Sequence, residues 1–321
     1  IRAAWGRLGN ERIGNYPYQA SMSFNDVLFY QGGAITPVQT AAQVVYAVQD
    51  ISWEATESFD VGIDLGLLNK RLSITADYYR KETKDILLKL DIPSYLGFEA
   101  PDQNAGVVGA KGWDLELNWR DKIGQLGYRI GANFSDAKTE IIDLKGTQIR
   151  GTNAQIEGYE FNSWFGYRSD GIYQTSDEVA GSAVLNNNTK AGDIRYIDID
   201  NDGKITPEGD MVPLGGALPR HIFGGSAYLD YKGFDFSIAF QGVGKVLSRL
   251  SNVQVRPFLE NFGNVPLNID GNYWSAYNTA EQNKTASYPR LSRASASNNY
   301  QMSDFWLING AYFRVKNITL G

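Results

Sequence analysis

Hydrophobic and polar residues alternate along several short stretches of this chain. In segment 59–67 every odd position is apolar and every even position is Asp or Gly, and segment 72–78 repeats the alternation after a short turn. The same pattern recurs in four further segments, which are 113–120, 128–135, 223–231 and 234–241. A period of two residues is typical of β-strands that have one apolar and one polar face. The pattern therefore predicts three antiparallel hairpins within about eight strands.

The connections between these strands alternate in length. Short turns join the strands of each predicted hairpin, at 68–71, 121–126 and 232–233. Much longer segments lie between the hairpins, at 9–54, 85–110, 136–220 and 243–309. Soluble domains rarely carry such long loops, whereas outer-membrane barrels have short periplasmic turns and long outer loops. We therefore expect an all-β fold that forms part of a large antiparallel transmembrane β-barrel.

The apolar rows of these strands end in aromatic residues, for example Trp113 and Trp119, or Phe234 and Phe240. Six residues span about 20 Å along a strand, and with a tilt near 40° this gives roughly 15 Å of height. The rings would then lie at or inside the margins of a lipid band about 25 Å thick. The opposite face carries charges that we expect to line the lumen, namely Asp60, Asp64, Asp77, Asp114, Glu116, Arg129 and Asp235.

The alternation is also compatible with a soluble β-sandwich, which would be a secreted calcium-binding or glycan-binding module. The two folds differ in what covers the apolar face. A second sheet would bury it in a sandwich, whereas no protein would cover it in a barrel. The residues that distinguish the two folds are Trp113, Leu115, Leu117, Phe236 and Ile238.

Composition excludes several functions. The net charge of −6 provides no basic excess for nucleic acid, and the absence of cysteine excludes thiol chemistry and disulfides. His221 is the single histidine, so a multi-histidine metal site is impossible within this chain. The sequence contains neither a nucleophile-elbow motif nor a Walker loop, and we expect that it is not an enzyme.

Segment 198–210 resembles the first half of an EF-hand calcium loop. Oxygen-bearing side chains occupy positions 1, 3 and 5, Gly203 follows at position 6, and an apolar residue stands at position 8. Position 12 is Gly209, and the carboxylates nearest to it are Glu208 and Asp210, so which of them closes the loop stays open. The alternative is a turn without an ion. The predicted calcium ligands are Asp198, Asp200, Asp202, the carbonyl of Lys204, and Asp210.

Segment 243–309 is rich in aromatic residues, including Tyr277, Tyr288 and Trp306. Exposed rings would stack on sugars or dock a partner, whereas buried rings would pack the outer loops together. We favour loop packing for most of these residues.

Several motifs resemble SusC/RagA-type TonB-dependent outer-membrane transporters. Residues 2–10, read as Arg-Ala-Ala-Trp-Gly-Arg-Leu-Gly-Asn, look like the family's RASWGxxGN stretch. Similar motifs follow in the family's order from end to end. They include Gly192-Asp193-Ile194-Arg195-Tyr196, Tyr288-Pro289-Arg290-Leu291, and the terminal Tyr312-Phe313-Arg314-Val315-Lys316-Asn317-Ile318-Thr319-Leu320-Gly321.

The resemblance implies a barrel of about 22 strands with an N-terminal plug. Residues 1–321 would be a C-terminal portion of this barrel, without the plug and the final strands, and 136–220 and 243–309 would be extracellular loops. It further implies TonB-dependent import of oligosaccharides or peptides across the outer membrane of a Gram-negative bacterium. The implied partners are a SusD-like surface lipoprotein, the TonB complex and outer-membrane lipid. The substrate-contacting residues stay unknown.

Overall fold

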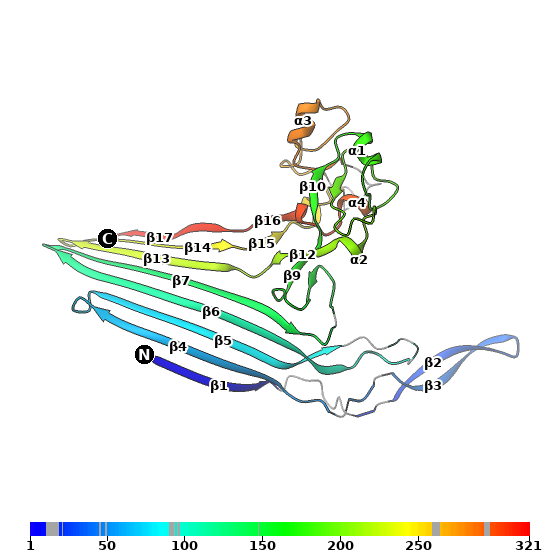
Figure 1. Cartoon of the computed structure of the whole chain (residues 1–321), viewed down its shortest axis with the longest axis horizontal. Helices are drawn as coiled ribbons and strands as arrows, with labels where there is room; N and C mark the ends of the chain where they lie inside the picture. The colour runs from blue at the N-terminus through cyan, green and yellow to red at the C-terminus, as the bar shows by residue number, and fades with distance from the viewer. Residues whose placement is uncertain are drawn as a thin grey trace. The chain divides into compact units, whose positions relative to one another are not determined.

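The computed structural model describes most of the chain (Figure 1). The described residues are 1–10, 19–20, 22–44, 46–48, 50–89, 93, 95, 97–146, 148–258, 264–291 and 296–321. They form two compact units. Unit 1 comprises Ile1–Asp121, Ser135–Gln148 and Ile156–Tyr159, and unit 2 comprises Lys122–Phe134, Ile149–Gln155 and Glu160–Gly321.

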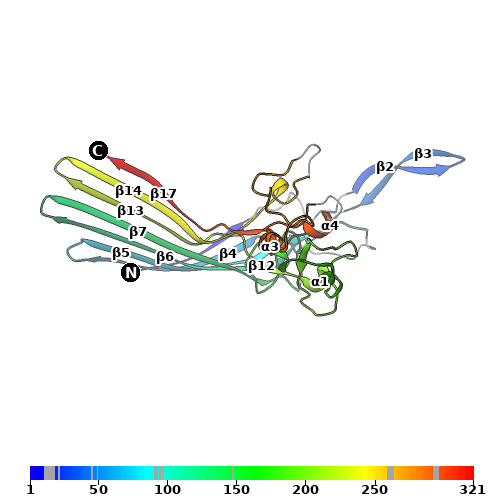
Figure 2. The ribbon, with the colours of Figure 1, turned by 90° about the horizontal axis from the view of Figure 1, so that it is seen from above.

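The long strands form one eight-stranded sheet in the order β1-β4-β5-β6-β7-β13-β14-β17. The bounds are β1 Arg2–Asn10, β4 Glu54–Leu67, β5 Leu72–Lys89, β6 Asp102–Ile123, β7 Leu126–Asp143, β13 Arg220–Tyr231, β14 Phe234–Lys245 and β17 Tyr312–Leu320. Figure 1 shows β1, β4, β5 and β6 side by side, and Figure 2 shows the same for β13, β14 and β17. The three predicted hairpins and the all-β fold class are confirmed. Among the described residues, no helix is long and apolar enough to cross a membrane.

Unit 1 has one apolar and one polar sheet face. Phe59 pairs with Trp5 and Arg80, and Val61 pairs with Tyr78, so the odd positions of β4 share a face with the even positions of β5. The other face carries charges, and Arg2 forms ion pairs there with Asp64 at 2.8 Å and Asp77 at 3.0 Å.

Within the part of the chain that the structure describes, no second sheet covers the apolar face of this sheet. Trp113 is 43% exposed, and the other four residues that distinguish a sandwich from a barrel are half-buried and lie outside the buried core. A sandwich would bury all five of these side chains. The soluble sandwich alternative is therefore wrong.

Strand β17 contains a β-bulge where it pairs with β14. Ala239 pairs with Asn317, but the next residue of β14, Phe240, pairs with Val315, so Lys316 is the extra residue. Because of this bulge, Val315 and Ile318 lie on the same face of the sheet, as partners of Phe240 and Ile238.

The strands are longer than the alternation predicts, and the loops are correspondingly shorter. β6 begins at Asp102 inside the predicted loop 85–110, and β7 continues to Asp143 inside the predicted loop 136–220. Residues 102–110 are mostly small or branched and do not alternate, so their pairing with β5 gives no period-two signal. In the predicted loop 9–54, β2 Met22–Gln31 and β3 Ala34–Gln43 form a hairpin of their own.

The long segments of unit 2 carry short elements. A three-stranded sheet has the order β12-β9-β8, and β10 pairs with β11 and β15 with β16. The strands are β8 Asn153–Ala154, β9 Ser163–Tyr167, β10 Ser169–Ile172, β11 Ile194–Tyr196, β12 Met211–Gly216, β15 Leu247–Arg249 and β16 Leu307–Asn309. The helices are α1 Ser176–Ala180, α2 Pro207–Asp210, α3 Ala280–Thr285 and α4 Ala296–Asn299, with 3-10 turns η2 Asn252–Gln254 and η3 Asp304–Trp306.

Candidate metal centre

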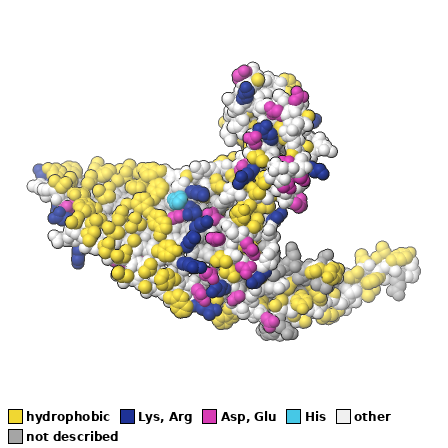
Figure 3. Space-filling view, in the orientation of Figure 1, with side chains coloured by type: hydrophobic (Ala, Val, Ile, Leu, Met, Phe, Trp, Pro, Cys, Tyr) yellow, Lys and Arg dark blue, Asp and Glu magenta, His cyan; other side chains and the backbone are white. Residues whose placement is uncertain are grey.

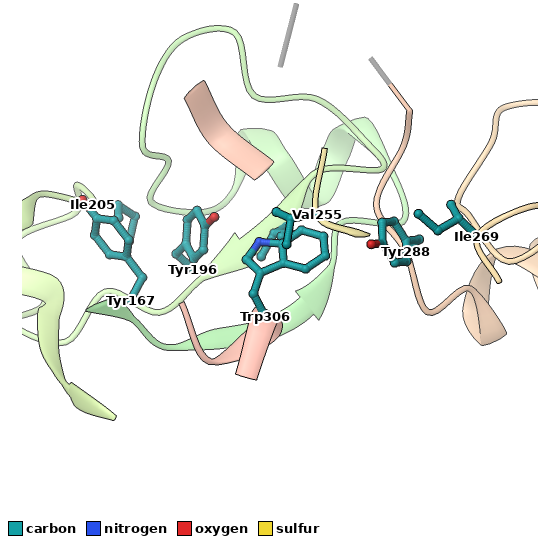
Figure 4. Close-up of a cluster of buried hydrophobic side chains, with 8 residues drawn as sticks. Tyr167, Tyr196, Ile205, Val255, Ile269, Tyr288 and Trp306 are labelled. Atoms are coloured by element: carbon teal, nitrogen blue, oxygen red, sulfur yellow. The ribbon is translucent and has the colours of Figure 1, made fainter. Parts of the chain in front are cut away.

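An aromatic core supports the long segments of unit 2 (Figure 4). Its buried members are Tyr167, Ile194, Tyr196, Ile205, Val255, Ile269, Tyr288 and Trp306. The rings of Tyr167 and Tyr196 lie 5.0 Å apart, and Tyr288 meets Trp306 edge-to-face at 5.3 Å. Among the described residues of segment 243–309, most aromatic side chains thus pack the loops, as we favoured, although Tyr277 is fully exposed; Phe262 lies outside the described residues.

The pKa values of two core tyrosines reflect the polarity of this environment. Burial raises the pKa of Tyr196 far above its usual value, and its hydroxyl donates a 2.6 Å hydrogen bond to the carbonyl of Asn298. Burial also raises the pKa of Tyr167 to about 12, with a further contribution from the carboxylates of Asp210 and Glu208. Tyr196 is therefore shielded from water, whereas Tyr167 lies near the carboxylates of the acidic loop.

A buried ion pair fastens two distant segments to this core. Asp193 is fully buried and accepts hydrogen bonds from Arg290 Nε at 2.7 Å and Arg290 Nη2 at 3.1 Å. Asn299 Nδ2 and the backbone N–H of Lys190 also donate to this carboxylate, both at 2.9 Å. The bidentate pair joins the motif that contains Asp193 to the motif that contains Arg290, 97 positions away.

The calcium-like loop follows directly after β11. The carboxylate oxygens of Asp198, Asp200 and Asp202 lie within 4.8 Å of one another. The backbone N–H of Gly203 donates to Asp198 Oδ2 at 2.9 Å, and the N–H of Lys204 donates to Asp202 Oδ1 at 2.8 Å. Ile205, at the apolar eighth position, is buried in the core and anchors the loop.

One oxygen of this cluster is buried and unpartnered. Asp198 Oδ1 accepts no hydrogen bond from any described residue. A buried carboxylate oxygen without a donor is costly, and a cation bound among the three carboxylates would compensate it. The hard oxygen donors of the loop suit Ca²⁺. The residues present therefore fit the ion.

Asp210, the expected fourth ligand, makes hydrogen bonds to both ends of the loop. Its carboxylate is fully buried and accepts the backbone N–H of Ile199 at 2.6 Å and of Thr206 at 2.7 Å. It therefore braces the two ends of the loop against each other. Among the described residues, the three carboxylates that converge do not include Asp210 or Glu208.

Steric crowding explains why position 12 of the loop is a glycine. A Cβ atom on Gly209 would overlap Asp200 Oδ2. The pKa of Asp200 is raised: the hydrogen bond from the Asp202 N–H favours the charged form, but burial and the negative charges of Asp202 and Asp210 outweigh it. The loop therefore brings several negative charges close together without a side chain at position 12.

A pocket opens beside helix α2. It has a volume of about 320 Å³ and is lined by Arg150, Phe165, Glu208, Met211 and Met302 among others. The guanidinium of Arg150 lies 5.6 Å from the centre of the Phe165 ring. The pocket thus combines an apolar wall with one cation and one carboxylate. Spacing along the sequence gives no signal for it, because its residues are spread over 150 positions and meet only in the folded loops.

Comparisons with known proteins agree with this architecture. A family model described as TonB dependent receptor-like, beta-barrel, matches residues 14–318. TonB-dependent receptor P3 of Formosa agariphila is 26% identical over the whole chain, and so is TonB-dependent receptor SusC of Bacteroides thetaiotaomicron. The chain covers 32% and 31% of these two proteins. It thus spans about a third of the length of the curated relatives that it matches.

The fold is also similar to a solved outer-membrane assembly. The structure titled as the RagAB peptide transporter superposes with a TM-score of 0.70 at 22% identity, over 99% of this chain and 34% of that one. A structure of the RagAB peptide importer in the open-open state gives the same TM-score at 21% identity.

Proposed function

The chain belongs to the TonB-dependent receptor-like β-barrel family, and on this premise we propose that it forms wall strands and outer loops of an importer of nutrient oligomers. Proteins of this family are receptors and transporters, and they lie in the outer membrane of Gram-negative bacteria. The observation that carries the proposal is the sheet, with an uncovered apolar face for lipid and a charged face for a wet interior.

We propose oligosaccharides or peptides as the cargo, delivered with a SusD-like surface lipoprotein and driven through TonB. The relatives named SusC and RagAB support this class, and the second is titled a peptide transporter. Uptake of labelled oligosaccharides and labelled peptides by cells with and without the full-length protein tests the proposal. We expect one of the two cargo classes to enter only when the protein is present, and a proton uncoupler to stop this uptake. Equal uptake of both classes by the two strains would contradict the proposal.

We further propose that the loop 198–210 holds a structural calcium ion. The side chains of Asp198, Asp200 and Asp202 and the carbonyl of Lys204 would hold it, while Asp210 braces the loop through its backbone hydrogen bonds. When bound, the ion neutralises the crowded carboxylates and stiffens an outer loop. The supporting observation is the convergence of the three carboxylates around a buried, unpartnered Asp198 oxygen.

Calcium titration of the detergent-solubilised full-length protein tests this site. The wild type should unfold several degrees higher in saturating Ca²⁺ than in chelator, because a ligand at 100 times its Kd adds about 2.7 kcal/mol of stability. Asp200→Ala/Asp202→Ala should lose this difference, whereas Asp177→Ala, which removes an exposed acid in helix α1, should retain it. If the chelator did not change the unfolding temperature of the wild type, the proposed calcium site would be ruled out.

A further inference from the structure

The apolar face of unit 1 ends abruptly on the side of the long connecting segments. Along β4 the outward residues from Leu67 back to Phe59 are all apolar, and their register partners on β5 are apolar from Leu72 to Tyr78. Eight residues of strand cover about 27 Å, or roughly 20 Å of height at a 40° tilt, which is close to the thickness of a lipid band. Beyond this stretch, the same face becomes charged.

The charge begins with two cations that face each other. In the register of the sheet, Arg80 of β5 is the direct partner of Lys111 of β6. Like charges opposite each other destabilise a pair of strands. Lys111 forms no ion pair with a described residue, and both side chains are exposed. Figure 3 shows dark blue Lys and Arg side chains beside the yellow hydrophobic side chains of the sheet.

The ion pairs of the described residues do not neutralise this pair. On the same face, Glu82 contacts Arg80 at 3.1 Å but is shared with Lys84 at 3.5 Å. Glu57 contacts Lys84 at 3.3 Å and Arg7 at 3.9 Å. These two carboxylates thus serve three cations, and no described carboxylate forms an ion pair with Lys111.

Aromatic rings lie immediately below the pair. Tyr78 and Trp113 are direct partners one step toward the apolar band, and Phe59 is the partner of Arg80 on the other side. All three rings are exposed. Aromatic residues of this kind mark the level of lipid headgroups, so the two cations stand where headgroup phosphates lie.

We propose that Arg80 and Lys111 form a binding site for the phosphate group of an anionic membrane lipid. Arg offers two parallel N–H donors to a phosphate, and Lys adds a point charge. A phosphate between them would relieve the like-charge pair while the acyl chains cover Tyr78, Trp113 and the apolar rows below. The cations lie at the end of the band toward the long loops, so the ligand is a phosphorylated glycolipid of the outer leaflet. The proposal rests on the membrane position of the sheet and is independent of the cargo.

Native mass spectrometry of the full-length protein with diphosphoryl lipid A tests the site. We expect Arg80→Gln/Lys111→Gln to reduce lipid retention about tenfold. Lys81→Gln is the matched control, because Lys81 neighbours Arg80 in sequence but lies on the polar face, over the Tyr79 ring at 5.5 Å. Unchanged lipid retention in the double variant, or an equal loss in the control, would overturn the proposal.

Two further measurements separate the alternatives. Inorganic phosphate at the lipid's concentration should not displace the lipid; full displacement would indicate a site for free phosphate and overturn the lipid assignment. Lys111→Glu should raise the melting temperature in lipid-free detergent, because it converts a repulsive pair into an attractive one, and should abolish the stabilisation that lipid A gives to the wild type. A variant that lipid A stabilises as strongly as the wild type would contradict the proposal.

Discussion

At the scale of single residues, the calcium-like loop depends on a position that carries no side chain. In an EF-hand, position 12 supplies a bidentate carboxylate, but here Asp200 occupies the space next to Gly209. The loop therefore gathers its carboxylates from its first half and uses Asp210 as a brace.

Gly209→Ala tests this arrangement. The added methyl group would displace the Asp200 carboxylate, and we expect calcium to bind about tenfold more weakly, a loss of roughly 1.4 kcal/mol. Isothermal titration of the purified protein measures the change. Gly181→Ala is the control, because a Cβ there meets only ordinary contact with the carbonyl of Asp177. Equal affinity in Gly209→Ala and the wild type would contradict this steric role of Gly209.

At the scale of elements, the buried ion pair between Asp193 and Arg290 holds two long segments of unit 2 together. Arg290→Met would leave a fully buried carboxylate without its cation, and we expect a loss of about 3–5 kcal/mol in the stability of the loops. Limited proteolysis across a denaturant series measures this loss. Arg195→Met removes an exposed ion pair with Asp170 and should cost at most about 1 kcal/mol. Similar losses in the two variants would contradict a special role for the buried pair.

The elements differ in how far the sequence reveals them. Strands with one apolar face, such as β4 and β14, could be predicted because their period of two is a local property. The part of β6 that precedes Lys111 could not be predicted, because small residues such as Gly106 and Gly109 give no alternation of apolar and polar positions. The convergence of the carboxylates of the calcium-like loop could be predicted from their spacing. The role of Asp210 could not, because it depends on backbone donors that only the folded loop brings near it.

At the scale of the whole molecule, the chain combines two kinds of stabilisation. The outer segments of unit 2 bury an aromatic core of their own, as a water-soluble domain does. The strand face of unit 1 instead leaves residues such as Trp5 and Phe59 exposed for lipid. The aromatic core of unit 2 is therefore stable in contact with water, whereas the apolar strand face of unit 1 requires lipid.

Ile63→Lys tests which face of the sheet meets lipid. Ile63 lies in the middle of the apolar rows, opposite Ala76, and a lysine near the bilayer midplane costs about 2–4 kcal/mol. Ser73→Lys places the same charge on the polar face of β5 and should change stability by a fraction of this amount. Folding equilibria in lipid vesicles measure both. A larger penalty for Ser73→Lys than for Ile63→Lys would reverse the assignment of the faces.

The extra residue at Lys316 has a consequence for how this strand tolerates insertions. A one-residue insertion in an ordinary strand would turn every later side chain to the wrong side of the wall. Because β17 absorbs Lys316 locally, Ile318 and Leu320 still point with Phe313 and Val315. This strand can therefore accommodate one additional residue while its apolar side chains stay on one face of the sheet.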